Sequence, residues 1–170
     1  MNFFEPQAIT RDEVIAAIED AKKNNTQINL AFRDFSDVDL SGLDLTFAIL
    51  AGGIFMDTDF TNTTLRAAQL HGATIEADFY GTDLTGANLT GASLTSSEFK
   101  NAILDGAKLD RALLMDASFE NVSARRASLG GTEPANAAFS NVDLTDANLI
   151  GLDFSMATMD EQTKSSANLQ

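Results

Sequence analysis

The residues that most often act as general bases, nucleophiles or metal ligands are scarce in this chain. His71 is the only histidine among 170 residues, and there is no cysteine. Serine and aspartate are plentiful, but a catalytic triad needs an oriented base and an oxyanion site at a cleft. Gly81, Gly86 and Gly91 recur at intervals of five, which is typical of repeat corners and not of a phosphate-binding loop. We therefore predict no enzyme, no catalytic residue, no metal site and no cofactor.

Carboxylates recur at a longer spacing, at Asp39, Asp59, Asp78 and Glu98. If the chain returns on itself about every twenty residues, these side chains stack in steps of about 5 Å. We call them the acidic ladder. Repulsion between like charges makes such a ladder a mild cost to stability. Two interpretations stay open: a stripe that binds the basic groove of a partner, or a solvated face with partly shielded charges that holds divalent cations only loosely.

A second candidate surface, which we call the irregular patch, has an unusual composition. It contains Arg125 and Arg126, then Gly130 and Gly131, then Pro134. The arginines are positive on an acidic chain, the glycine pair loosens the backbone, and proline cannot donate to a β ladder. The patch is either a deformable, partly basic interaction site or an irregularity that the fold tolerates.

The net charge of −14 restricts the class of partner. It disfavours direct binding to nucleic acid or to an anionic membrane surface, both of which need cationic side chains. It permits binding to a basic protein surface. There is no secretory signal pattern and no apolar run of membrane-spanning length. Together with the lack of cysteine, these features predict a cytoplasmic protein with an unidentified protein partner.

The elements that must position these residues follow a five-residue period. Between Phe79 and Leu94, a large apolar residue returns at every fifth position, and a small residue stands two places before it. We call the large apolar position the centre. Centres continue from Leu30 to Met159, with one four-residue step between Ile75 and Phe79. Five matches neither the helical period nor the strand period, so the pattern indicates a solenoid with one unit per side.

Every fourth centre tends to share its residue type. The leucine column contains Leu30, Leu50, Leu70, Leu89, Leu109, Leu129 and Leu149, and the phenylalanine column contains Phe60, Phe79, Phe99, Phe119 and Phe139. Such sorting is expected if residues four units apart stack, so we predict a four-sided coil of about twenty residues. Both columns continue across the four-residue step. We therefore expect the step to tighten one corner and bend the rod slightly.

The units Ala87-Asn88-Leu89-Thr90-Gly91 and Ala147-Asn148-Leu149-Ile150-Gly151 match the pattern A(D/N)LXX. On these units the chain resembles the pentapeptide-repeat family, over roughly residues 28–160. The resemblance implies an all-β solenoid of the right-handed quadrilateral parallel β-helix type.

Residues 1–27 are predicted to form an irregular lead-in over 1–9 and a capping helix over about 11–23. Thr10 and Glu13 make a capping-box pattern, and the apolar stripe that follows suits a helix covering the open end of the solenoid. Residues 28–160 form the β-helix. Residues 161–170 form a C-terminal cap and tail, with a short turn or helix near Asp160 and a frayed end from Ser165.

Two functions are consistent with these features. The first is a rigid, non-enzymatic scaffold that presents an acidic surface to protein partners. The second follows from the resemblance: the quinolone-resistance members of the family are acidic rods that bind DNA gyrase in place of DNA. Against the second, no long apolar helix follows Met159 and no loop interrupts the period. Outward apolar pairs such as Leu113 with Met115 allow self-association, so we expect a monomer or a weak homodimer.

Overall fold

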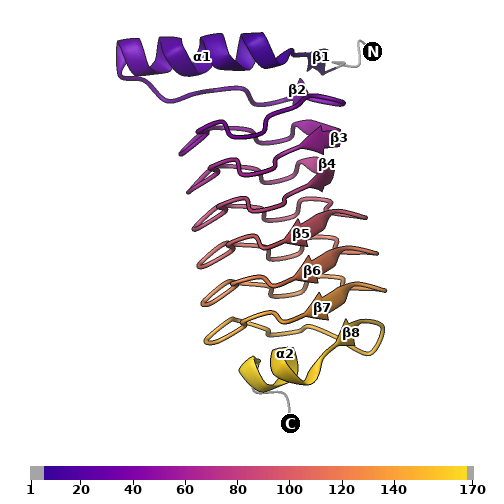
Figure 1. Cartoon of the computed structure of the whole chain (residues 1–170). Helices are drawn as coiled ribbons and strands as arrows, with labels where there is room; N and C mark the ends of the chain where they lie inside the picture. The colour runs from indigo at the N-terminus through magenta and orange to yellow at the C-terminus, as the bar shows by residue number, and fades with distance from the viewer. Residues whose placement is uncertain (1–5, 168–170) are drawn as a thin grey trace.

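The computed structural model describes residues 6–167, which wind into a right-handed, four-sided parallel β-solenoid with a helix across each end (Figure 1). A parallel sheet of eight strands in chain order, each strand paired with the next, runs along the rod and passes from one wall to the adjacent wall at its two longest strands. The elements are β1 (Gln7–Ala8), α1 (Arg11–Asn24), β2 (Arg33–Asp34), β3 (Ile54–Asp59), β4 (Thr74–Asp78), β5 (Glu98–Lys100), β6 (Ser118–Glu120), β7 (Ala138–Ser140), β8 (Thr158–Met159) and α2 (Glu161–Ser166). The predicted fold class is confirmed.

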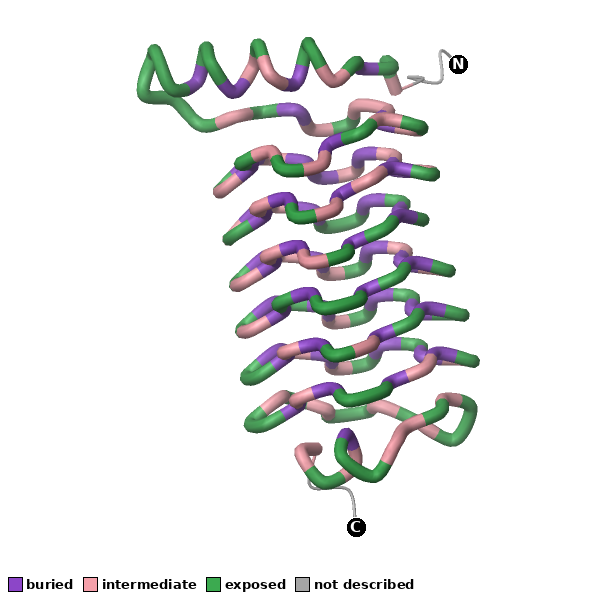
Figure 2. Tube along the Cα trace, viewed as in Figure 1, coloured by how far each residue is buried: buried purple, intermediate pink, exposed green. Residues whose placement is uncertain are grey.

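The predicted columns form the core. Leu70, Leu89 and Leu109 are at most 1% exposed, and Phe79 and Phe99 are fully buried. The rings of these two phenylalanines stack with their centroids 4.6 Å apart and their planes within 4°. That spacing matches the distance between hydrogen-bonded strands, so one ring per coil fills the interior without a gap. Figure 2 shows the resulting alternation of buried and exposed residues along every coil.

Each corner is a turn with a left-handed residue. The residue two places after almost every centre has a positive φ, from 52° at Ala67 to 78° at Gly151. The next residue closes the turn onto the centre, as where the Ala87 N–H donates to the Leu84 carbonyl at 2.9 Å. A turn with a positive φ at its third position favours Gly and Asn. This requirement explains why glycine and asparagine recur at these positions.

The four-residue step removes a corner residue. Met56 pairs with Glu76 and Thr58 with Ala77, so Asp57 of β3 bulges and has no counterpart in β4. Ala77 instead donates its backbone N–H to the buried Ser97 hydroxyl at 3.3 Å, and that hydroxyl lies 3.3 Å from the Ile75 carbonyl. Strand β4 therefore runs straight where the other coils turn. The step does more than tighten a corner, because the projecting residue is missing altogether.

Helix α1 covers the first coil. The capping box is confirmed, because Thr10 accepts from the Glu13 N–H and Glu13 accepts from the Thr10 N–H. Val14, Ile18 and Ala21 are buried against the solenoid. The predicted end of the helix at residue 23 was one residue short. The irregular lead-in was wrong at residues 7–8, which form β1 and pair with β2; residues 1–5 of that prediction lie outside the described residues.

Helix α2 closes part of the other end. The predicted fraying from Ser165 was wrong for Ser165 and Ser166, which belong to α2; residues 168–170 of that prediction lie outside the described residues. Thr163 is fully buried, and its hydroxyl accepts the Val142 N–H at 3.0 Å. Among the helices of residues 6–167, neither combines the length and the apolar content that crossing a membrane requires.

Candidate functional site

The acidic ladder is stacked as its spacing predicts. Asp39 pairs in register with Asp59, Asp59 with Asp78, and Asp78 with Glu98. Each aspartate uses one carboxylate oxygen to accept the backbone N–H two residues on, at 2.7–2.8 Å. Hydrogen bonds from Ser41, assisted by the Arg11 charge, lower the pKa of Asp39. The ladder ends after Glu98, because Ser118 and Ala138 occupy the next two registers.

A hollow of about 460 Å³, which we call the carboxylate notch, lies beside the ladder. It lies at the corner where the four-residue step removes a residue, between Asp57 of one coil and Ser96 two coils on. Five carboxylates line it: Asp57, Asp59, Glu76, Asp78 and Glu98. None of the five forms an ion pair with a cationic side chain of residues 6–167. Three of these residues were predicted as ladder members, whereas Asp57 and Glu76 were not predicted.

The residues of the irregular patch lie in one coil but on different sides of it. The coil continues through them with ordinary inter-coil bonds, such as Leu129 N–H to the Asn148 carbonyl at 2.9 Å. Arg125 is paired with Asp143 at 2.8 Å, and Arg126 and Gly131 occupy left-handed corners. Pro134 stands on the following side. The five residues therefore form a band around the rod and do not gather on one face.

Neither the carboxylate notch nor any other part of the described chain arranges its side chains as a metal site. His71 is exposed on the surface. Within residues 6–167, no group of three or more His, Asp or Glu side chains has the geometry to hold a metal ion.

Two exposed phenylalanines were missed by the sequence analysis. Phe32 and Phe47 are 64% and 62% exposed and have φ values of 58° and 61°. A bulky residue with positive φ is uncommon. Both stand two places after a centre, so the corner position would have identified them. A Cβ on Gly52 would lie 2.6 Å from the Phe32 ring, which shows that this ring rests on the glycine of the next coil.

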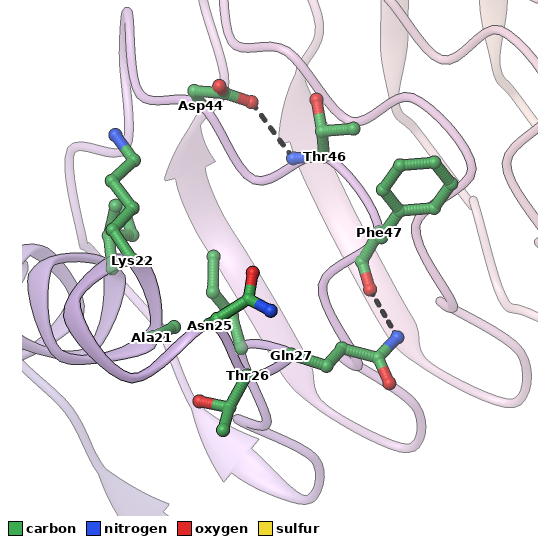
Figure 3. Close-up of a pocket in the computed structure, with 10 residues that line it drawn as sticks. Ala21, Lys22, Asn25, Thr26, Gln27, Asp44, Thr46 and Phe47 are labelled. Carbon is green, nitrogen blue, oxygen red and sulfur yellow. Dashed lines mark hydrogen bonds between the residues drawn. The ribbon is translucent and has the colours of Figure 1, made fainter.

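A second hollow of about 520 Å³ lies between the end of α1 and the first coil, and we call it the cap groove (Figure 3). Ile18, Ala21 and Ile28 contribute apolar surface, and Asp44 and Thr46 contribute polar atoms. The Asp44 carboxylate accepts the Thr46 N–H at 3.0 Å. Hydrogen bonding from Thr46, with a smaller contribution from the Lys22 charge, lowers the pKa of Asp44. No sequence motif pointed to this groove.

The architecture is that of a parallel β-solenoid built from five-residue sides. The family model for pentapeptide repeats matches the chain in eight copies, over residues 26–62, 39–76, 75–111 and 135–161. These ranges cover more than half of the chain. The chain therefore belongs to the pentapeptide-repeat family.

Solved structures of the same family resemble the chain. QnrB1, a plasmid-mediated fluoroquinolone resistance protein, is 20% identical, with a TM-score of 0.56 and coverage of 85% of this chain and 87% of that one. HetL, a protein of the cyanobacterium Nostoc sp. strain PCC 7120 involved in heterocyst differentiation regulation, is 27% identical, with a TM-score of 0.47 and coverage of 78% and 76%. No curated protein matches the sequence. At these levels of similarity, the comparisons establish the fold and no function.

Proposed function

We propose that this protein is a non-enzymatic scaffold whose carboxylate notch and acidic ladder bind a basic surface of a partner protein. The observation that carries the proposal is the convergence of five carboxylates around one missing corner residue. The four-residue step sets a hollow into an otherwise regular wall, and this hollow can admit a lysine or arginine side chain.

The chemistry of the notch supports a cationic occupant. Asp59 and Asp78 each commit one oxygen to their own turn, so the second oxygen points to no donor within residues 6–167. The notch lacks ion pairs to that part of the chain, so its field is not cancelled locally. The stacked coils fix the backbone that carries the carboxylates, and turn hydrogen bonds hold Asp59 and Asp78, which lowers the ordering cost of binding. Association should therefore be specific and should weaken as salt increases.

Capture from the native host with three forms of the protein tests the proposal. The notch variant carries Asp57→Asn, Glu76→Gln and Glu98→Gln, which removes three charges without breaking a hydrogen bond of residues 6–167. The control variant, Asp12→Asn with Glu19→Gln and Asp146→Asn, removes three charges elsewhere on the surface. We expect mass spectrometry to identify a protein that is retained by the wild type and the control, lost with the notch variant, and released by high salt. If the notch variant retains every partner, the proposal is wrong.

A DNA-mimic function that targets gyrase stays a prediction based on charge. QnrB1 has the same fold, but at 20% identity this similarity extends only to the fold. A gyrase supercoiling assay decides: inhibition at micromolar protein would favour the mimic, and no effect would remove it. A cytoplasmic location also stays a prediction, to be tested by fractionation of the host cell.

A further inference from the structure

The outer edge of the first coil is covered differently on successive sides of the solenoid. Strand β1 pairs with β2 on one side. On the next side, the Arg11 side chain lies over residues 39–41. On the side after that, residues 44–46 border the cap groove. The edge of a sheet presents unpaired backbone groups. The element that covers each side of the first coil therefore indicates which donors or acceptors that side can bind.

Arg11 shows how a side chain satisfies this edge. Its Nη1 donates to the Asp39 carbonyl and, at 3.0 Å, to the Asp39 carboxylate, while its Nη2 donates to the Ser41 carbonyl at 3.0 Å. One planar guanidinium thus bonds two backbone oxygens and a carboxylate oxygen. These three acceptors belong to two residues, Asp39 and Ser41, of one repeat unit.

The next repeat unit presents the same three acceptors. Asp44-Leu45-Thr46 follows Asp39-Leu40-Ser41 by five residues, and both aspartates accept the N–H two places on, at 3.0 Å and 2.8 Å. The backbone N–H groups of Leu40 and Leu45 both donate to carbonyls of the next coil at 2.8 Å, so the two units have equivalent positions in the coil. The Asp44 carbonyl, the Thr46 carbonyl and the Asp44 carboxylate therefore repeat the arrangement that holds Arg11.

This second set of acceptors has no cationic donor. Within residues 6–167, no hydrogen bond reaches the Asp44 or Thr46 carbonyl, and the Asp44 carboxylate forms no ion pair. In Figure 3, the Lys22 side chain stands beside Asp44 but has no bond to it. The cap groove in front of these atoms has a volume of about 520 Å³, which exceeds the volume of one side chain.

We propose that the cap groove binds an arginine side chain presented by a partner protein. Its guanidinium would donate to the Asp44 and Thr46 carbonyls and to the Asp44 carboxylate, as Arg11 does one unit earlier. Its aliphatic stem would lie on Ile18, Ala21 and Ile28. Lysine is a poorer fit, because a single ammonium cannot span acceptors that a planar fork bonds together.

Lys22 modulates this site. Its charge attracts the Asp44 carboxylate and also opposes a second cation in the groove. The arginine site is therefore weakened, but not filled, by the protein's own lysine. The proposal is independent of the carboxylate notch, which lies on a different part of the rod and involves none of these residues.

The test uses the full chain labelled with ¹³C and ¹⁵N, and three small probes: the N-acetyl amides of L-arginine, L-lysine and L-citrulline. We expect saturable shifts of the Asp44 and Thr46 carbonyl resonances with the arginine probe. We expect at least fivefold weaker binding of the lysine and citrulline probes. The Asp39 and Ser41 carbonyls should not move, because Arg11 already occupies them.

Three variants sharpen the test. Asp44→Asn should weaken the arginine probe at least fivefold while keeping the turn, since Asn88 supports the same turn to the Thr90 N–H at 3.2 Å. Asp143→Asn, the matched change in the last coil of the same column, should leave binding unchanged. Lys22→Gln should tighten binding two- to threefold.

The proposal is overturned if the Asp44 and Thr46 carbonyls do not shift, if the lysine probe binds as well as the arginine probe, or if Asp44→Asn has no effect. Shifts confined to Asp57, Glu76 and Glu98 would report the notch alone and would also overturn it. If the notch binds no partner while the Asp44 and Thr46 carbonyl resonances still shift with the arginine probe, only the proposed function is contradicted.

Discussion

The two ends of the rod are closed by different means. At the N-terminal end, a 14-residue helix buries Val14, Ile18 and Ala21 on the first coil. At the C-terminal end, Thr163 is the only buried residue of a 6-residue helix, and Leu149, Leu152 and Phe154 of the last coil stay partly exposed. The same side-chain columns run through both ends. The difference shows that burial at a terminal coil depends on the length of its cap and not on the repeat sequence.

The largest expected effect compares Phe35 and Phe154, two centres on the same side of the solenoid that lie outside the phenylalanine column. Phe35 in the first coil is fully buried and stacks on Phe55 at 4.5 Å, whereas Phe154 in the last coil contacts Phe139 only edge-on at 5.9 Å. Phe35→Ala should destabilise by about 3–5 kcal/mol, and Phe154→Ala by about half of that or less. Denaturant unfolding measures both. Equal costs would mean that the two caps protect the core alike.

A smaller effect is expected from the hydrogen bonds of the short cap. Thr163→Val keeps the shape of the side chain but removes the acceptor of the buried Val142 N–H. The cost should be about 1–3 kcal/mol, because a buried donor is left unsatisfied. Thr95→Val, on a partly exposed wall position, is the control and should cost less than about 0.5 kcal/mol. A cost for Thr163→Val as small as that of the control would show that α2 does not seal the edge.

Arg11→Met probes the equivalent seal at the other end. The change keeps an unbranched stem but removes the donors to the Asp39 and Ser41 carbonyls. Because water can reach these carbonyls in its place, thermal unfolding should show a loss of only about 0.5–1 kcal/mol. A loss above that of Thr163→Val would reverse the expected order of the two seals.

The last prediction concerns acid and has no assigned energy. Hydrogen bonds from Thr10 lower the pKa of Glu13 near one end, and those from Thr163 lower the pKa of Asp160 near the other. A carboxylate with a lower pKa when folded stabilises the protein above its unfolded pKa, and that stability is lost as the pH falls through the folded pKa. Amide protection factors, which remove the intrinsic pH dependence of exchange, should therefore fall at both ends below about pH 4. The coils between residues 45 and 142 hold one carboxylate with a lowered pKa, Asp83, and should lose less protection. An equal loss of protection along the rod would contradict this.

The sequence was sufficient for the architecture because the core repeats. Identical centres such as Leu70 and Leu89 can sort into columns only if the chain returns every four units, and the capping box fixed the start of α1. The ladder register followed from the same period. The cap groove could not be predicted, because it depends on the angle at which α1 crosses the first coil. The notch could not be predicted either, because a missing residue can tighten a corner or abolish it, and Ser97 decides which by bonding Ala77.

The stacked asparagines at one corner have a consequence for the length of the rod. Asn121 donates its side-chain amide to Asn101 at 3.3 Å, and Asn141 donates to Asn121 at 2.8 Å, so each coil repeats the contact below it. Duplicating or deleting one twenty-residue block in this region would restore the asparagine contact and the backbone bonds between coils at the new junction. The rod would grow or shrink by about 4.8 Å, the spacing between adjacent strands, and each cap helix would keep its contacts with its terminal coil. The distance between the notch and the C-terminal end is therefore a quantity that duplication can set in discrete increments.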